Sequence, residues 1–214
     1  DVYKRQEVYI ISGGLLEPVR EFGLFLGLPK ENIRAVGVAY NELSGQWWVD
    51  DDQQNLAYED GALTVSDGKA EIVKELLAGK AGRSLLIGDG LSDLYAGRAV
   101  DLFVGYGGVV SRRKVREEAP LFIQCESLAP LLAVAAGPAA IRRLFSTPFD
   151  NLGHKAWELI QTGAISFNNE RLNRKFSEAI EAYKTFYSRP DGSAPGDSGR
   201  PGALDDWAPD AGMR

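Results

Sequence analysis

Two aspartates, four residues apart, follow an apolar run in the segment Leu85–Asp93. The run predicts a buried strand, and the glycines on either side of Asp89 let the backbone turn sharply there. Such a strand delivers Asp89 to the carboxyl edge of a sheet. Carboxylate oxygens suit a hard cation such as Mg²⁺, which works on phosphates. The pattern therefore predicts a metal site at Asp89 and Asp93; a turn aspartate followed by a helix-capping or surface aspartate is the alternative.

Two polar segments upstream could act on the same phosphate. Ser12-Gly13-Gly14 closes one predicted strand and opens a helix, where a hydroxyl and exposed backbone N–H groups make an anion site. Lys69 begins a later helix, where its ammonium could neutralise a phosphate oxygen or an attacking carboxylate. Considered alone, the first is an ordinary N-cap and the second a surface lysine. Together with the aspartates they lie at the sheet edge where doubly wound folds bind ligands, which favours a joint site.

Strands and helices alternate along the chain and must position these groups. The predicted strands are 7–12, 33–40, 84–87, 101–104 and a weaker 121–123, with an antiparallel excursion pairing 46–49 with 62–65. The predicted helices are 15–26, 69–78, 91–98, 128–136, 156–162 and 171–187. This order predicts an α/β fold with a Rossmann-like parallel sheet and helices on both faces.

The character of the sequence changes beyond Pro138. Residues 138–188 are predicted to form a helical extension with an apolar stripe made of Leu172, Phe176, Ile180, Tyr183 and Tyr187. We expect this stripe to pack on the α/β domain; a partner-binding helix is the alternative. Residues 189–214 are rich in proline and glycine and are predicted to be a disordered tail.

Composition narrows the classes of function. The chain has 214 residues and is 44% apolar, enough for one α/β domain with a sizeable core. A net charge of −6 gives no reason to expect nucleic acid or an anionic membrane as partner. No apolar run approaches the ~20 residues that span a bilayer. A single cysteine, Cys125, cannot form an internal disulfide and is compatible with the cytoplasm. A single histidine, His154, argues against a multi-histidine zinc site or a Ser-His-Asp triad.

Three motifs in this order resemble the haloacid dehalogenase (HAD) superfamily of phosphatases. They are Val8-Tyr9-Ile10-Ile11-Ser12-Gly13-Gly14, Asp67-Gly68-Lys69 and Ile87-Gly88-Asp89-Gly90-Leu91-Ser92-Asp93. Within the superfamily the likeness is strongest to phosphoserine phosphatases, because the segment 99–108 is similar to the one that follows their metal motif. The resemblance covers about residues 7–134, and we assign residues 7–137 to a partial HAD-like core.

The resemblance implies a role for each matching residue. Family members hydrolyse phosphomonoesters through an aspartyl-phosphate with Mg²⁺ bound, which here implies a small phosphorylated metabolite, most simply O-phosphoserine. Asp89 would ligate the metal and Asp93 would support its shell. The phosphate-binding set would be Ser12, Gly13, Gly14, Lys69 and Ser92, with Lys69 also offsetting charge at the nucleophile. Ser92 departs from the asparagine common at its position.

One family motif is absent. The nucleophile and the acid/base residue belong to an Asp-x-Asp motif on a strand upstream of Ser12, and no such pair precedes Ser12 here. The cap that recognises the substrate would also be missing. The resemblance therefore implies a core lacking its first central strand and its cap, with a gap between the strands that carry Ser12 and Asp89. We expect the chain as written to be inactive and the full-length protein to be the phosphatase.

The first six residues support a truncated sequence. Asp1-Val2-Tyr3-Lys4-Arg5-Gln6 is the translation of GATGTGTATAAGAGACAG, a transposon-end adapter, so we interpret residues 1–6 as an assembly artefact. A genuine, slightly basic N-terminus is the alternative. Two other functions stay open: a HAD phosphatase for another small metabolite phosphate, and a phosphate-binding or regulatory homologue without chemistry. A response-regulator receiver fits poorly, because its acidic pair comes early in the chain.

Overall fold

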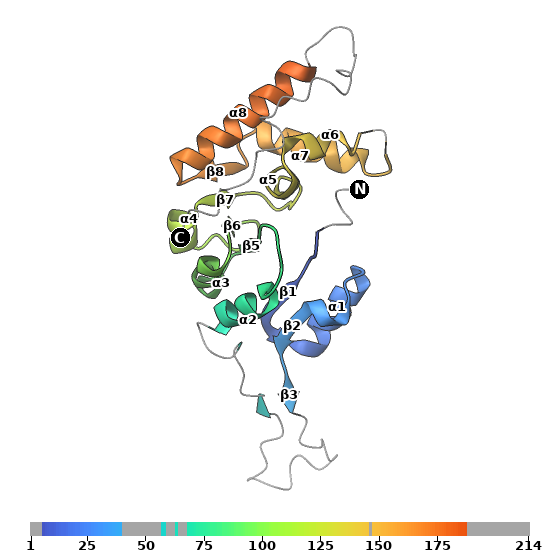
Figure 1. The fold of residues 1–214 in the computed structure, drawn as a ribbon, viewed down its shortest axis with the longest axis vertical. Helices are drawn as coiled ribbons and strands as arrows, with labels where there is room; N and C mark the ends of the chain where they lie inside the picture. Colours follow the sequence, from blue (N-terminus) through green and yellow to red (C-terminus); the bar gives the residue numbers. More distant parts are fainter. Residues whose placement is uncertain (1–5, 40–56, 59–62, 64–67, 146, 188–214) are drawn as a thin grey trace. The chain divides into compact units, whose positions relative to one another are not determined.

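The computed structural model describes residues 6–39, 57–58, 63, 68–145 and 147–187 (Figure 1). The chain divides into two compact units, residues 1–76 and 77–214. The predicted hairpin partner 46–49, most of 62–65, the adapter-like residues 1–5 and the predicted tail 189–214 lie outside the described residues.

The first unit is built on short parallel and antiparallel strand pairs. In chain order its elements are β1 (Ile10–Leu15), α1 (Leu16–Phe25), the 3₁₀ turn η2 (Lys30–Asn32), β2 (Ile33–Val36), β3 (Val38–Ala39), β4 (Ala57–Tyr58) and α2 (Gly68–Leu77). β1 pairs with β2 in parallel, and β3 pairs with β4 antiparallel. Helix α1 approaches β2 closely at Gly23, where any Cβ would overlap the side chain of Ile33. Glycine at this position therefore lets the helix lie directly against the strand.

The predicted bounds of the first strand, residues 7–12, are wrong. Strand β1 begins at Ile10 and continues through Leu15, so Ser12-Gly13-Gly14 lies within the strand and the helix starts only at Leu16. The pairing register shifts between Ile11 and Leu15, where three residues of β1 face a single residue, Ala35, of β2. Such extra residues form a bulge, which bends a strand and re-aims its side chains. The Gly-Gly pair is therefore part of a bulge rather than the amino end of the helix.

The second unit contains a larger sheet. Its elements are β5 (Leu85–Gly88), α3 (Leu91–Ala96), the 3₁₀ turn η4 (Gly97–Ala99), β6 (Leu102–Tyr106), α4 (Arg113–Glu118), β7 (Leu121–Ile123), α5 (Leu131–Ala136), α6 (Pro138–Arg142), α7 (Asp150–Gln161), β8 (Ile165–Phe167) and α8 (Glu170–Tyr187). The sheet order is β5-β6-β7-β8. The first three strands are parallel and β8 is antiparallel to β7. The predicted α/β class with a mostly parallel sheet is confirmed.

Alternate side chains of this sheet enter two apolar layers, as the two-residue period of a strand requires. One layer joins Phe103 and Phe122 to Val115 of α4 and Leu94 of α3. The other layer joins strand residues to α5–α8; its buried members include Val104, Leu121, Ile123, Ile141, Ala156 and Leu172. In Figure 1, α4 and α5 lie on opposite sides of β6 and β7. Helices therefore cover both faces of the sheet, as predicted.

The helical extension packs on the core. Leu172, Phe176 and Ile180 of α8 are buried in the same apolar cluster as Leu121 and Ile123 of β7. This confirms the prediction that the stripe packs on the α/β domain; the side chains of Tyr183 and Tyr187 lie outside the described part. None of the described helices has the length and apolar character needed to cross a bilayer.

Three elements of the second unit were not predicted. They are α4, α6 and β8, which have six, five and three residues. Elements this short show too few periods of apolar residues to be distinguished from loops. Among the described strands, β1 and β5 belong to different sheets.

Candidate phosphate and metal site

Asp89 lies directly after β5, at the carboxyl end of the sheet, as the sequence predicted. Its side chain is 42% exposed, so the carboxylate is accessible. Nη1 of Arg112 donates a hydrogen bond to Oδ2 at 2.6 Å, a distance typical of a charge-assisted pair. Asp89 is therefore a solvent-facing carboxylate held by one cation.

Asp93 has a different environment, in the first turn of α3. It is only 8% exposed, and its Oδ2 accepts a hydrogen bond from the backbone N–H of Gly90 at 3.0 Å. This bond caps the first turn of α3, where a carboxylate is also favoured by the helix dipole. A Cβ at Gly88 would overlap the Asp93 side chain, so glycine is required before Asp89. Asp93 thus stabilises the turn that presents Asp89.

The bulge of β1 sets the geometry at Ser12. Its Oγ accepts a hydrogen bond from the backbone N–H of Gly14 at 3.0 Å. Gly13 is exposed, and a Cβ built there would meet nothing within 4 Å. The segment is therefore open enough for a ligand to approach its backbone, and bulges are frequent next to active sites.

The two other predicted phosphate-binding side chains start helices. Lys69 is half-buried in the first turn of α2, and Ser92 is half-buried in the first turn of α3. The second unit brings Asp89, Ser92 and Asp93 together in one turn. Ser12, Gly13, Gly14 and Lys69 belong to the first unit. That both groups converge on one phosphate stays a prediction.

The described side chains fit Mg²⁺ better than a metal that needs several protein ligands. Among residues 6–39, 57–58, 63, 68–145 and 147–187, no group of three or more His, Cys, Asp or Glu side chains is arranged to hold a metal. Mg²⁺ is commonly held by one or two carboxylates, with waters and substrate phosphate completing its shell. Asp89 supplies one accessible carboxylate, and Asp93 holds the turn that presents it, so the residues present fit this mode of binding.

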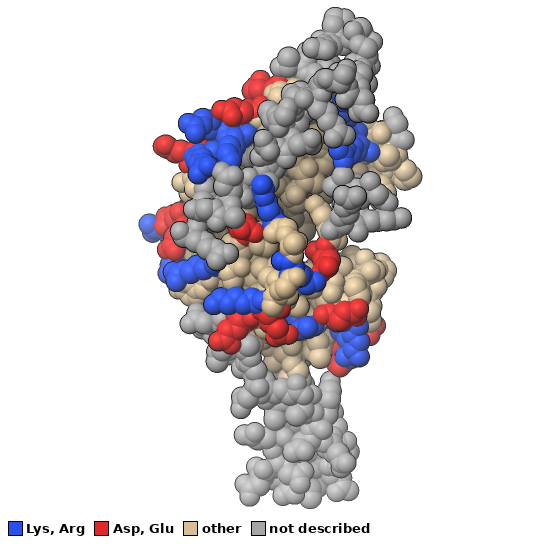
Figure 2. All heavy atoms as spheres, in the orientation of Figure 1, with Lys and Arg blue, Asp and Glu red and all other residues tan. Residues whose placement is uncertain are grey.

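Arg112 was missed by the sequence prediction. It precedes α4 at the end of the loop from β6, in the basic run Ser111-Arg112-Arg113-Lys114. Its neighbours pair within their own helix, Arg113 with Glu117 at 2.8 Å and Lys114 with Glu118 at 3.9 Å. Basic and acidic side chains lie next to one another on the face seen in Figure 2. A basic run after a glycine-rich strand end is the only signal in the sequence that pointed to Arg112.

The glycine-rich segment after β6 has a structural role. Tyr106 donates from its hydroxyl to the carbonyl oxygen of Glu126 at 2.7 Å. Burial raises the pKa of Tyr106 above its usual 10.0, with smaller contributions from Cys125 and Glu126, so the hydroxyl keeps its proton. A Cβ at Gly108 would overlap the Tyr106 ring and the Cys125 carbonyl. These glycines allow close packing beside the site rather than forming a phosphate loop.

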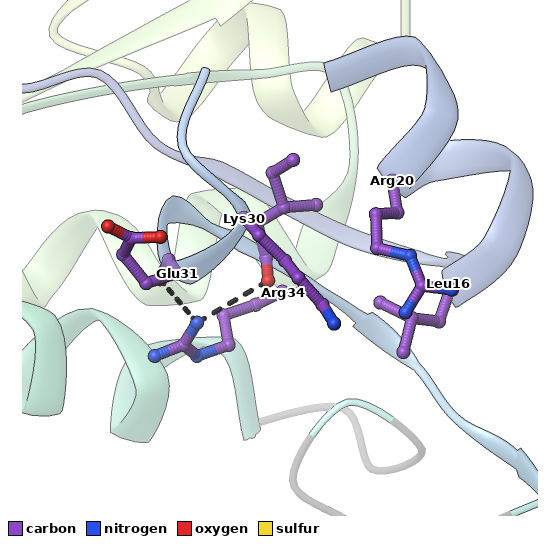
Figure 3. Close-up of a pocket in the computed structure, with 6 residues that line it drawn as sticks. Leu16, Arg20, Lys30, Glu31 and Arg34 are labelled. Atoms are coloured by element: carbon purple, nitrogen blue, oxygen red, sulfur yellow. Dashed lines mark hydrogen bonds between the residues drawn. The ribbon is translucent and has the colours of Figure 1, made fainter. Parts of the chain in front are cut away.

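A cavity of about 380 Å³ lies elsewhere in the first unit (Figure 3). Its lining residues are Leu16, Arg20, Lys30, Glu31, Ile33 and Arg34. Arg34 donates to the carbonyl oxygens of Glu31 at 2.5 Å and Ile33 at 3.4 Å, and Arg20 pairs with Glu17. None of the predicted site residues lines this cavity. Because both arginines are already partnered, we do not assign the candidate site to it.

Known proteins share sequence with this chain. No protein-family model matches the chain. A chloroplastic phosphoserine phosphatase of Arabidopsis thaliana is 34% identical over 127 residues, which are 57% of this chain and 40% of the relative. The phosphoserine phosphatase of Homo sapiens is 31% identical over 119 residues, 55% of this chain and 49% of the relative. The chain thus spans half or less of the length of these relatives.

One solved structure, a phosphoserine phosphohydrolase-like protein from Francisella tularensis, aligns with a TM-score of 0.44 at 24% identity. The alignment covers 61% of this chain and 57% of the Francisella tularensis chain. The chain is an α/β protein, and three of its sequence motifs resemble those of HAD phosphatases. In particular it is similar to phosphoserine phosphatases over about half of its length, which confirms the resemblance inferred from the motifs.

Proposed function

We propose that this chain is the phosphate- and metal-binding part of a Mg²⁺-dependent phosphatase that hydrolyses a small phosphomonoester, with O-phosphoserine as the expected substrate. One observation carries the proposal: a chain similar to phosphoserine phosphatases places an accessible carboxylate, Asp89, at the end of β5. The whole protein would then be a phosphoric monoester hydrolase.

Asp89 and Asp93 divide the metal-binding role in this proposal. The exposed carboxylate of Asp89 would ligate Mg²⁺, and the buried Asp93 would keep the turn in place. When bound, the metal supplies positive charge that offsets the negative charges of the phosphoryl group and an attacking carboxylate.

The remaining residues would bind the phosphoryl group. The hydroxyls of Ser12 and Ser92 and the backbone N–H groups of Gly13 and Gly14 are donors of the kind that hold phosphoryl oxygens. Lys69 would neutralise charge between the phosphoryl group and the nucleophile. Pre-positioned donors of this type stabilise charge where it develops in phosphoryl transfer.

The proposal assigns no nucleophile to the residues of this chain. No Asp-x-Asp pair precedes Ser12 in the chain, and covalent catalysis cannot proceed without the attacking carboxylate. We therefore predict that the purified 214-residue chain releases no phosphate from O-phosphoserine with Mg²⁺ present, measured as free phosphate. Measurable Mg²⁺-dependent release by this chain would contradict the assignment.

The complete reading frame provides the positive test. We expect an Asp-x-Asp pair within about 100 residues before Ser12, the size of a small domain segment. The complete protein should hydrolyse O-phosphoserine, and Asp89→Asn should lower kcat at least 100-fold, on the scale of one lost electrostatic group. The conservative Asp51→Asn is the matched control, because the resemblance gives Asp51 no role. A complete frame without the aspartate pair would favour a non-catalytic phosphate binder, and faster hydrolysis of another phosphomonoester would reassign the substrate.

A further inference from the structure

The ion pair between Arg112 and Asp89 joins the carboxyl ends of neighbouring strands. Asp89 follows β5, and Arg112 ends the loop that leaves β6, the parallel partner of β5. The two residues are 23 positions apart, and both side chains are about half-exposed. Exposed pairs stabilise proteins little, so stability alone does not explain this contact.

The geometry of the contact leaves part of the carboxylate available. Nη1 of Arg112 donates its hydrogen bond to Oδ2 of Asp89. A second oxygen, Oδ1, then remains for a cation. Carboxylates that bind metals are usually themselves hydrogen-bonded, which fixes their orientation.

A second contact supports the position of Arg112. Two residues further on, Lys114 donates from Nζ to the hydroxyl of Tyr95 at 3.3 Å and lies 5.4 Å from the centre of its ring. Tyr95 belongs to α3, the helix that also carries Ser92 and Asp93. The start of α4 is thereby tied to the helix of the site.

We propose that Arg112 is a positioning residue that orients the Asp89 carboxylate for a divalent cation by holding its Oδ2. This inference rests on the proposed function, because it assumes that Asp89 is a metal ligand. The opposite view treats Arg112 only as a nearby positive charge. The two views predict effects of opposite sign: loss of orientation weakens cation binding, whereas loss of repulsion strengthens it.

Metal affinity of the 214-residue chain distinguishes them. Mn²⁺ is titrated as a paramagnetic probe into ¹⁵N-labelled protein, the broadening of the amide signals of residues 88–93 gives its Kd, and Mg²⁺ competition gives the Kd of Mg²⁺. Arg112→Met should weaken binding on the order of 10-fold. Arg112→Lys should recover part of the loss, because its ammonium can still donate to Oδ2.

Arg113→Met is the matched control. Arg113 is adjacent, carries the same charge and pairs with Glu117 of its own helix, so its loss should change Kd less than twofold. Urea unfolding of each variant verifies that the fold is intact. The inference would be wrong if Arg112→Met bound the cation as tightly as the unmutated chain or more tightly. It would also be wrong if Arg113→Met weakened binding equally. Neither result would contradict the assignment of the metal site to Asp89. Absence of site-specific broadening in the unmutated chain would instead overturn the metal assignment itself, and the inference with it.

Discussion

The two compact units differ in how well each one buries its own apolar side chains. In the second, a four-stranded sheet is covered on both faces, and Leu121, Phe122 and Ile123 of β7 are fully buried. In the first, each described sheet has two strands, and α1 leaves large apolar side chains in solvent, with Phe25 86% exposed. Isolated strand pairs are marginally stable in water, so we expect the first unit to open at lower free energy.

This difference separates the two halves of the candidate site. Asp89, the proposed metal ligand, and Asp93, which holds its turn, lie on the unit whose four-stranded sheet is covered on both faces. Ser12 and Lys69, which would bind the phosphate, lie on the unit with the two-stranded sheets. The metal half should therefore be well ordered under conditions in which the phosphate half already fluctuates.

Truncating a phenylalanine in each unit should give the largest contrast. Phe122→Ala removes a fully buried ring and should lower the free energy of unfolding by about 3–5 kcal/mol. Phe25→Ala removes an exposed ring and should change it by less than about 0.5 kcal/mol. Urea unfolding combined with hydrogen exchange at β6 and β7 measures both. If Phe25→Ala costs as much as Phe122→Ala, the apolar face of α1 is covered and the comparison fails.

A glycine-to-alanine pair should give an intermediate contrast. In Gly88→Ala the new methyl group overlaps the Asp93 side chain, which should destabilise the second unit by about 1–3 kcal/mol. In Gly13→Ala the methyl group meets nothing within 4 Å, so the change should stay within about 0.5 kcal/mol. Thermal unfolding of both variants measures the difference. A neutral Gly88→Ala would mean that Asp93 moves freely and does not hold the Asp89 turn.

The sequence allowed the periodic elements and the strand-end residues to be predicted. The apolar run before Asp89 predicted β5, and the stripe through Leu172 and Phe176 predicted α8 and its packing, because both patterns repeat over several residues. Helix α4 escaped prediction because it buries only Val115. The bulge at Ser12 depends on the register of a partner strand, which local sequence does not encode.

The Arg112–Asp89 pair could not be predicted for a related reason. Its members are 23 positions apart and meet only because β5 and β6 are parallel neighbours. Motif spacing indicates which residues lie at a sheet edge, but ion pairs across that edge depend on loop conformation. The residue proposed as the metal ligand, Asp89, was therefore accessible from sequence, whereas the arginine proposed to orient it was not.

A serine-to-alanine pair gives the smallest and most informative contrast. Ser84 Oγ donates to Asp101 Oδ2 at 2.8 Å and accepts from the Asp101 N–H at 3.0 Å, which links the starts of β5 and β6. Ser84→Ala should cost about 1–2 kcal/mol in urea unfolding, because two partly buried hydrogen bonds are lost. Ser12 Oγ accepts a single bond, from Gly14, so Ser12→Ala should cost only a few tenths of a kcal/mol.

The serine pair also bears on function. A hydroxyl that contributes little to stability is available to bind a ligand, so a near-neutral Ser12→Ala fits the phosphate-binding role proposed for Ser12. If Ser12→Ala destabilised the chain as much as Ser84→Ala, the hydroxyl would be needed to hold the bulge of β1. Ser12 would then act on phosphate only indirectly, through the backbone N–H groups of Gly13 and Gly14 that the bulge exposes.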